Sequence, residues 1–161
     1  MATCVAVFAY GGNLDPQRMA ERVGSFNLRE YACLKNWKVC FEKQAGDGSG
    51  YANIVKSEGD VVEGALYEIE PAAIRALDRY EGVASGHYRR VKATVITKQS
   101  GDRECWLYVA EQSRCQRGLR PRREYLNHLL KGQDIFTSFY TDRLRNVPVH
   151  DSTQESAERN S

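Results

Sequence analysis

The sequence predicts a single α+β domain built around a curved or closed sheet. Most apolar runs have the length and the β-branched and aromatic content of strands. Shorter helical segments fall irregularly between them, and they do not alternate with strands as in an α/β protein. The 161 residues, of which 42% are hydrophobic and 27% charged, are sufficient for one ordinary core.

The first strand and helix carry the clearest local signals. The continuous apolar run Val5–Tyr10 ends at two glycines, which predicts a buried strand entering a tight turn. Asp15 then stands where a helix N-cap belongs, and Pro16 stands at the first helical position. We therefore expect a short helix that ends near Val23.

Turn signals divide the middle of the chain into strands. The glycine-rich segment 46–50 predicts a hairpin loop, and Ser57-Glu58-Gly59-Asp60 predicts a second turn. The strand candidates that these turns separate are Tyr31–Phe41, Tyr51–Val55 and Val61–Ile69. Three successive strands are expected here.

The second half of the chain alternates between helical and extended signals. Glu70-Pro71 opens a helix that stops before Gly82, and Pro121 opens another that Gly132 is placed to end. The remaining candidates are strands at Tyr88–Lys98 and Glu104–Ala110 and a last short helix from Ile135 to Leu144. The domain is expected to span residues 1–147, and residues 148–161 to form a polar, disordered tail.

Composition excludes several classes of function. Lys and Arg number 23 and Asp and Glu 21, and a net charge of +2 calls for neither a nucleic-acid nor a membrane partner. No apolar run approaches the roughly 20 residues that span a bilayer, and no secretory signal is recognised at the N-terminus. The five cysteines form no Cys-x-x-Cys pair, so we expect a cytoplasmic protein without a structural metal site.

Gly11 and Gly12 are the first candidate site. Between a buried strand and a helix N-terminus, consecutive backbone amides can hold a carboxylate without a cationic side chain. The alternative is that the two glycines only end a strand. A nucleotide phosphate is not favoured, because no Gly-Lys-Ser/Thr follows.

Glu81 is the candidate general base. It lies between Tyr80 and Gly82, and enclosure there would raise its pKa from about 4.3 toward roughly 6–7, where a base can also return its proton as an acid. The alternative is a solvated residue after a helix. Asp78, three residues earlier, is expected to be an exposed helix residue.

Aromatic and basic residues elsewhere leave two interpretations open. Tyr10, Tyr88 and Tyr125 are suited to orienting a polar substrate, yet each is equally suited to a core. The arginines between Arg114 and Arg123 are expected to be solvated. The alternatives are a basic patch that docks an acidic partner or steers an anionic substrate, and an RNA- or protein-docking module.

Several stretches together resemble the γ-glutamylcyclotransferase family, over roughly residues 5–132. The family's opening signature, Tyr-Gly-Ser-Asn-Leu, is similar to Tyr10-Gly11-Gly12-Asn13-Leu14, with Gly12 in place of serine. The other matching stretches are Leu77-Asp78-x-x-Glu81-Gly82-Val83-x-Ser85-Gly86-x-Tyr88, Ala52-Asn53-Ile54, Gly59-Asp60-x-Val62-x-Gly64-x-Leu66-Tyr67 and Tyr125 before the Leu129-Leu130 helix.

The resemblance implies a small mixed β-barrel with flanking helices and an enzyme that needs no metal or cofactor. Glu81 would be the general acid/base, the Tyr10–Leu14 turn would hold the γ-glutamyl group, and Tyr88 and Tyr125 would contact the substrate. The product would be 5-oxoproline. The resemblance does not decide whether the leaving amine is an amino acid, the ε-amine of lysine or an intermediate of antibiotic synthesis. A homodimer is an open alternative. The alternative function is a non-catalytic binding or interaction module on the same fold.

Overall fold

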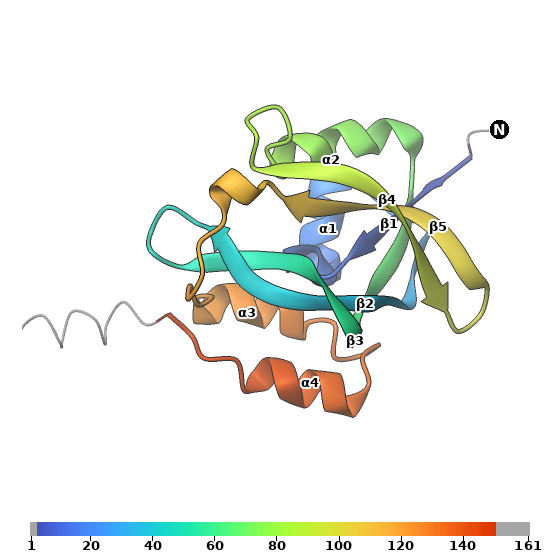
Figure 1. Ribbon diagram of the computed structural model, residues 1–161. Helices are drawn as coiled ribbons and strands as arrows, with labels where there is room; N and C mark the ends of the chain where they lie inside the picture. The colour runs from blue at the N-terminus through green and yellow to red at the C-terminus, as the bar shows by residue number, and fades with distance from the viewer. Residues whose placement is uncertain (1–2, 151–161) are drawn as a thin grey trace, which may run out of the picture.

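The computed structural model describes residues 3–150 and shows a closed β-barrel with helices packed against its outside (Figure 1). The strands are β1 Val5–Ala9, β2 Leu28–Gln44, β3 Gly50–Ile69, β4 Tyr88–Thr97 and β5 Gly101–Ala110. Their order around the barrel is β1-β3-β2-β4-β5, and a parallel pairing at Val7 and Trp106 closes it. The other neighbouring strands are antiparallel. The α+β class and the expected barrel are confirmed.

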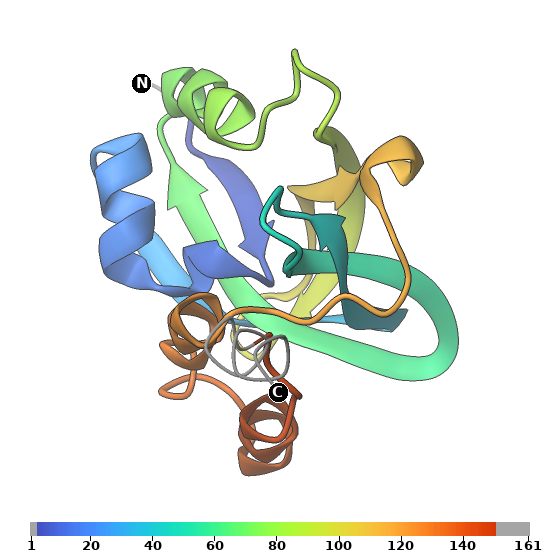
Figure 2. The same ribbon diagram turned by 90° about the vertical axis from the view of Figure 1, so that its left-hand side faces the viewer.

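The helices form two groups. They are α1 Pro16–Val23, α2 Ile74–Tyr80, α3 Arg123–Leu130 and α4 Ser138–Arg145. Helices α1 and α2 pack together on one side of the barrel, and α3 and α4 pack together below it (Figure 2). Single 3-10 turns lie at Gly12–Leu14, Pro71–Ala73 and Gln112–Arg114. The turn at Gly12–Leu14 contacts α1 and α3, so it is held where the two helix groups meet.

The start of α1 is as predicted. The Asp15 side chain accepts a hydrogen bond from the Gln17 amide at 3.1 Å, and Pro16 is the first helical residue. The other Asp15 oxygen lies 2.9 Å from Nδ1 of His128 on α3. One N-cap therefore ends the glycine turn, starts α1 and ties α1 to α3.

The expected pair of strands after residue 50 is a single strand, and this prediction was wrong. Strand β2 pairs with β3 on both sides of the expected turn, at Trp37 with Lys56 and at Lys35 with Val61. Between these two pairs the four β3 residues 57–60 face only Asn36 of β2, so β3 has extra residues that form a bulge in the ladder. Gly59 has φ +86°, and its amide donates to Asn36 Oδ1 at 3.1 Å. The turn signals belonged to a bulge because the partner strand continues past it.

Other boundaries shift by a few residues. Helix α4 begins at Ser138, after the expected start at Ile135, because Thr137 is its N-cap and accepts from the Tyr140 amide. Buried Glu63 of β3 fixes this cap by accepting from the Thr137 amide at 2.8 Å and from its hydroxyl at 2.7 Å. The cap partner lies far away in sequence, so local signals misplace the helix start.

The hydrophobic core, which includes side chains of the strands and of the helices that cover them, is tightly packed beside the first strand. The largest fully buried side chains are Tyr67, Phe8, Leu14, Met19, Ile54, Leu66, Ile69, Leu77, Leu107, Leu126, Leu129 and Val62. Gly64 lies so close to β1 that a Cβ there would be 2.3 Å from the Ala9 carbonyl oxygen and 2.7 Å from the Phe8 ring. This contact fixes the end of β1, from which the glycine turn leaves the barrel.

The chain beyond α4 continues to pack on the domain. Val149 contacts the core, and the His150 amide donates to the Pro121 carbonyl at 2.7 Å. The rest of the expected tail, residues 151–161, lies outside the described residues, and the expected domain boundary stays a prediction. Within residues 3–150, every helix is too short or too polar to cross a membrane.

Candidate active site

A cavity of about 460 Å³ opens between the end of β1, helix α1, the β2–β3 loop and the α2–β4 loop. Every residue predicted for the site lines it except Leu14: Tyr10, Gly11, Gly12, Asn13, Glu81, Tyr88 and Tyr125. Leu14 is fully buried in the core, so it anchors the turn and does not border the cavity. The fold therefore brings together two segments that are about 70 positions apart in the sequence.

The glycine turn is tight and closely covered. The Leu14 amide donates to the Gly11 carbonyl at 3.0 Å, whereas the amides of Gly12 and Asn13 have no hydrogen-bond partner within residues 3–150. A Cβ on Gly11 would lie 3.0 Å from the Tyr125 hydroxyl, so glycine permits this close approach. A Cβ on Gly12 would meet nothing nearer than 3.4 Å, so space does not dictate the departure from serine there.

Contrary to expectation, cationic side chains also border the turn. Arg18 and Arg22 of α1 line the cavity, and the guanidinium carbon of Arg18 would lie 3.5 Å from a Cβ on Gly12. The two arginines are four residues apart, so they share one helix face. This spacing, directly after the turn, is a sequence signal that the prediction of a purely backbone cradle overlooked.

Glu81 is enclosed and loosely paired. It follows α2 as its C-cap, and its side chain is 17% exposed. Oε1 lies 3.3 Å from Asn13 Nδ2, which donates to it, and 3.8 Å from Arg22 Nη1. Burial raises the pKa of Glu81 above its ordinary value of 4.5, and this effect outweighs the opposing effects of Arg22 and Asn13.

Asn13 links the turn to the carboxylate. Its side-chain oxygen accepts from Arg22 Nη1 at 2.8 Å, while its nitrogen faces Glu81. This orientation gives the amide oxygen to a cation and the amide nitrogen to a carboxylate, as electrostatics requires. Arg22, Asn13 and Glu81 therefore act as one unit at the mouth of the turn.

Gly82 provides the sharp turn expected beside Glu81. It has φ +66°, and a Cβ there would lie 2.8 Å from His87 Cδ2. The Gly82 carbonyl accepts from the amides of both Ser85 and His87, at 3.1 and 3.0 Å. The chain therefore folds back on itself directly after the candidate base and places His87 against the cavity.

The three candidate tyrosines differ in whether their hydroxyl proton is already donated to another group of the protein. Tyr10 donates to the Tyr108 carbonyl, and Tyr88 donates to the Ala52 carbonyl at 2.9 Å. Tyr125 instead accepts from the Ala52 amide at 3.0 Å, so its own proton remains available. Burial raises the pKa of all three phenols, which keeps them protonated. Tyr125 is therefore the one of the three suited to donate to a ligand.

Asp78 is not the exposed helix residue that the sequence predicted. Its Oδ1 accepts from Tyr108 OH at 2.8 Å and from Arg90 Nε at 2.9 Å, and its side chain is 25% exposed. These partners come from β5 and β4, which the local sequence cannot indicate. Asp78 fastens α2 to the barrel and so sets the position of Glu81 three residues later.

Two further basic residues, Lys43 and Arg114, line the cavity, and neither was among the predicted site residues. Lys43 is only 4% exposed and lines the cavity, because a bulge in β2 between Cys40 and Lys43 changes which side of the strand it occupies. Arg114, from the basic segment expected to be solvated, also lines the cavity, and its Nη2 donates to the Ser85 carbonyl at 3.0 Å. The alternation of side chains along β2 does not predict that Lys43 faces the cavity, because the bulge shifts it. The composition of the basic segment does not predict that Arg114 reaches the cavity, because its contact with Ser85 is a long-range one.

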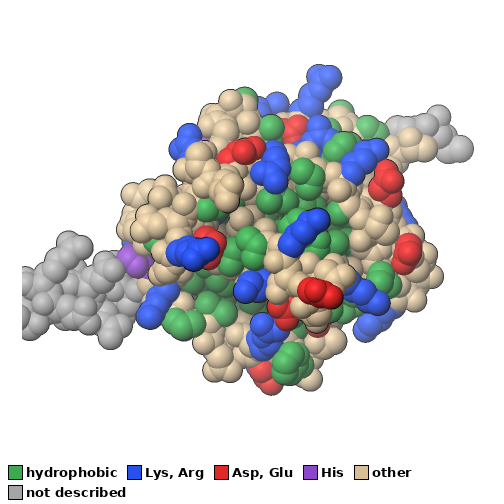
Figure 3. Space-filling view, viewed as in Figure 1, with side chains coloured by type: hydrophobic (Ala, Val, Ile, Leu, Met, Phe, Trp, Pro, Cys, Tyr) green, Lys and Arg blue, Asp and Glu red, His purple; other side chains and the backbone are tan. Residues whose placement is uncertain are grey.

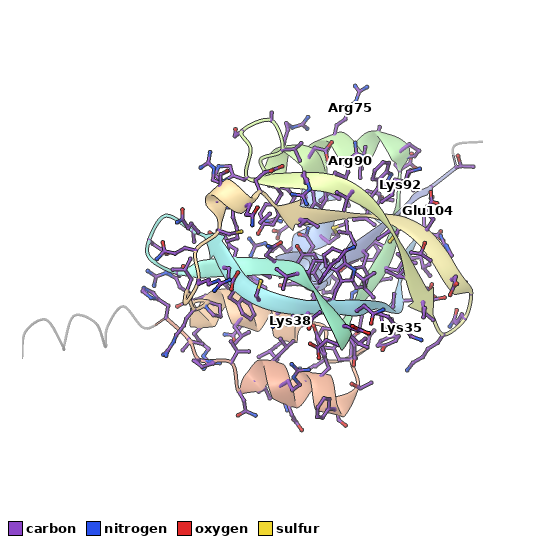
Figure 4. All side chains as sticks on the ribbon, in the orientation of Figure 1. Lys35, Lys38, Arg75, Arg90, Lys92 and Glu104 are labelled. Carbon is purple, nitrogen blue, oxygen red and sulfur yellow. The ribbon has the colours of Figure 1, made fainter. Side chains whose placement is uncertain are left out.

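The other basic residues do not form a continuous patch on the face that Figure 3 shows. There Lys and Arg side chains are interspersed with acidic and apolar ones (Figure 3). Figure 4 labels Lys35 and Lys38 on β2, Arg75 on α2, Arg90 and Lys92 on β4 and Glu104 on β5. Lys92 pairs with Glu104 at 3.2 Å, and Arg90 pairs with Asp78. Two of the basic side chains that Figure 4 labels, Arg90 and Lys92, therefore have an acidic partner on this face.

The described part of the chain contains neither a cluster of metal-ligating side chains nor a disulfide. Within residues 3–150, no three His, Cys, Asp or Glu side chains are grouped to hold a metal ion. The cysteines there are all free. The groups that line the cavity are a carboxylate, guanidinium and ammonium groups, an imidazole, phenols and backbone amides.

Comparison with known proteins agrees with the motifs. A model of the AIG2-like family matches residues 61–144. Bovine γ-glutamylcyclotransferase is 34% identical over 106 residues, which cover 63% of this chain and 56% of that protein. The human enzyme is 33% identical over 107 residues, covering 63% and 57%. The chain thus spans little more than half the length of the curated relatives that it matches.

Solved structures extend the likeness to almost the whole fold. A structure named γ-glutamyl cyclotransferase superposes with a TM-score of 0.85 at 26% identity, covering 93% of this chain and 91% of that one. YkqA from Bacillus subtilis superposes with a TM-score of 0.77 at 22% identity, covering 91% and 56%, which bears on the fold alone. Because the family match extends over half of the sequence, the chain belongs to the AIG2-like family.

Proposed function

We propose that the protein is a γ-glutamylcyclotransferase. It would cyclise the γ-glutamyl group of a γ-glutamyl amino acid or amine to 5-oxoproline and release the free amine. The observation that carries this proposal is a carboxylate with a raised pKa, Glu81, in contact with Asn13 of a glycine turn inside one cavity. The names of the relatives support the same activity.

The turn would hold the glutamyl end of the substrate. The unpaired amides of Gly12 and Asn13 are suited to the α-carboxylate, with Arg18 adding a positive charge beside them. Tyr125 covers the turn with a phenol that can donate to the same group or to the γ-carbonyl. Together these contacts would fold the flexible glutamyl chain so that its amine faces its own γ-carbonyl.

Glu81 would move the protons. As a carboxylate it takes a proton from the α-ammonium, and the freed amine attacks the γ-carbonyl carbon to close a five-membered ring. The bond to the leaving nitrogen then breaks as Glu81 returns the proton to it. The ring nitrogen then gives up a second proton to Glu81, which passes it to the released amine, so that over the whole reaction the α-nitrogen loses two protons, the leaving amine gains two and Glu81 ends in its starting state. A raised pKa suits a group that must both accept and donate.

Ring closure needs modest help from the protein. An intramolecular attack already carries a high effective molarity, so holding the folded conformer is most of the task. A backbone donor that stabilises the developing oxyanion contributes about 3 kcal/mol. No covalent intermediate is required in this scheme.

The test is release of 5-oxoproline from a panel of γ-glutamyl amino acids, γ-glutamyl-ε-lysine and γ-glutamyl amines. Wild type is compared with Glu81→Gln, a near isostere that cannot take a proton, and with Glu58→Gln, an exposed residue on the β3 bulge. We expect Glu81→Gln to lose about 10²–10⁴-fold in kcat and Glu58→Gln to match wild type. Near-normal turnover by Glu81→Gln would refute the mechanism.

If the wild type releases no 5-oxoproline from any compound of the panel, the alternative is favoured, which is a non-catalytic binding module on this fold. The fold is compatible with that outcome, because a fold alone does not establish an activity. It would be distinguished from a misfolded preparation by a cooperative unfolding transition in the same sample.

A further inference from the structure

The two carboxylate oxygens of Glu81 have different surroundings. Oε1 accepts from Asn13 Nδ2 at 3.3 Å and lies 3.8 Å from Arg22 Nη1, whereas Oε2 has no hydrogen-bond partner within residues 3–150. In the same residues the only fully buried side-chain nitrogen or oxygen without a partner is Glu30 Oε1, so Glu81 Oε2 is not sealed from solvent. The protein therefore holds one oxygen of Glu81 and leaves the other open to the cavity that Glu81 lines.

Arg22 keeps Asn13 in the orientation that holds Oε1. Its Nη1 donates to Asn13 Oδ1 at 2.8 Å, so the amide oxygen is occupied and the amide nitrogen points toward Glu81. If the amide turned over, its oxygen would face the carboxylate and its nitrogen would face the guanidinium, and both contacts would be repulsive. The arginine therefore fixes the amide, and the amide fixes the carboxylate.

Arg22 is itself fixed by Tyr80. Helices α1 and α2 pack together, and the guanidinium carbon of Arg22 lies 4.9 Å from the centroid of the Tyr80 ring (Figure 2). Tyr80 directly precedes Glu81 and is 59% exposed, whereas the Arg22 side chain is only 16% exposed. The exposed ring thus covers the arginine that reaches Glu81, and two contacts, one to the ring and one to Asn13, hold the guanidinium.

The charged and titratable groups around Glu81 come from several elements. Arg22 and Arg18 of α1 and Lys43 of β2 each favour the carboxylate form, and the effect of Arg22 on the pKa of Glu81 is the largest of the three. Within residues 3–150, Arg22 alone places a cationic nitrogen within 4.0 Å of a Glu81 oxygen. The neighbouring phenols stay neutral because burial raises the pKa of each, and they are Tyr10, Tyr88, Tyr108 and Tyr125.

Resting on the proposed function, we propose that Arg22 is the positioning residue of Glu81: through Asn13 it holds Oε1, so that Oε2 is the oxygen that takes and returns the proton. Arg22 acts through Glu81 and does not bind the substrate. Arg18, four residues earlier on the same helix face, is the arginine that borders the turn. The charge of Arg22 also opposes the effect of burial on the pKa of Glu81, which keeps more of the base ionised at neutral pH.

The direct test is a titration of the Glu81 carboxyl by NMR, in protein labelled with carbon-13 at the glutamate side-chain carboxyls. The Glu81 signal is the one that Glu81→Gln lacks. In Arg22→Met we expect the pKa of Glu81 to rise by about 1 unit or more, because an opposite charge at this distance is lost. Arg22→Lys keeps the charge and should restore most of the wild-type value. Arg79→Met removes an exposed arginine of α2 and should leave the pKa unchanged.

The pH dependence of 5-oxoproline release gives a second readout. The acid limb of kcat/KM reports the base of the free enzyme, so in Arg22→Met it should move to higher pH by the same amount as the NMR titration. At the pH optimum we expect kcat to fall about 10- to 100-fold, because the carboxylate is no longer held in one orientation. KM should stay near the wild-type value. A rise in KM with unchanged kcat would show that Arg22 contacts the substrate and would overturn the proposal.

Tyr80→Ala keeps the proposal testable if Arg22→Met does not fold, because its position is exposed. Loss of the ring frees the guanidinium, so the pKa of Glu81 should shift in the same direction by a smaller amount. An unchanged pKa of Glu81 in Arg22→Met, or in Tyr80→Ala where Arg22→Met is unfolded, would overturn the proposal.

The titration needs no turnover, so it separates this inference from the proposed function. If Arg22→Met shows the expected shift but the wild type releases no 5-oxoproline, the pairing of Arg22 with Glu81 stands and the proposed reaction fails. If the wild type releases 5-oxoproline but Arg22→Met keeps both the pKa and kcat, this inference fails and cyclisation stands.

Discussion

The hydroxyl of Tyr67 is the internal support of the glycine turn, and Tyr67→Phe tests it. Tyr67 is fully buried on β3, and its hydroxyl donates to the Asn13 carbonyl at 2.7 Å. The same oxygen accepts from Arg29 Nε at 3.3 Å, and Arg29 Nη2 donates to the Leu14 carbonyl at 3.0 Å. Phenylalanine keeps the ring and its edge-to-face contact with Phe26, so only the hydroxyl is lost.

The expected loss of stability follows from the Asn13 carbonyl, which Tyr67→Phe leaves without its hydrogen-bond donor. Removing one partner leaves a buried carbonyl without its donor, which costs about 1–3 kcal/mol. A value near 2 kcal/mol corresponds to a fall in Tm of about 4–8 °C for a chain of this length. Because the loss loosens the turn that carries Gly12 and Asn13, we also expect KM for a γ-glutamyl substrate to rise.

Urea unfolding followed by circular dichroism measures the free energy of unfolding, and 5-oxoproline release measures KM. Tyr80→Phe is the matched control for stability, because Tyr80 is 59% exposed and its change should stay within about 0.5 kcal/mol. If Tyr67→Phe also stays within about 0.5 kcal/mol of wild type, the hydroxyl does not support the turn, and the reasoning is refuted.

Two further predictions concern Glu81 and Gly64. Burial raises the pKa of Glu81, so the wild type loses stability as pH rises from the ordinary value of 4.5 through the folded-state value. Glu81→Gln should therefore match wild type in acid and exceed it in thermal stability at neutral pH; lower stability there would mean that the pairing with Arg22 dominates. Gly64→Ala should cost about 1–3 kcal/mol or more in urea unfolding, because its Cβ would lie 2.3 Å from the Ala9 carbonyl oxygen; an unchanged unfolding midpoint would show that β1 shifts freely.

Local chemistry made the first part of the site readable from the sequence. The strand at Val5–Ala9, the glycine turn and the Asp15 cap depend on neighbours within a few residues, and each was predicted. The enclosed carboxylate next to Gly82 was also predicted, from its aromatic flank and from the family motif. Features of this kind can be predicted without knowledge of the fold because the interacting groups are adjacent in the chain.

The remaining features depend on partners that only the folded barrel brings together. The bulge in β3 exists because β2 continues past it, and the bulge in β2 places Lys43 in the cavity. Asp78 is held by residues of β4 and β5, so its role was invisible in its own helix. The sequence by itself therefore determined most of the elements, the glycine turn and the candidate base, but not the continuity of β3 or the start of α4. Tertiary structure alone decided which charges meet in the cavity, because strand register and long-range pairing set the direction of each side chain.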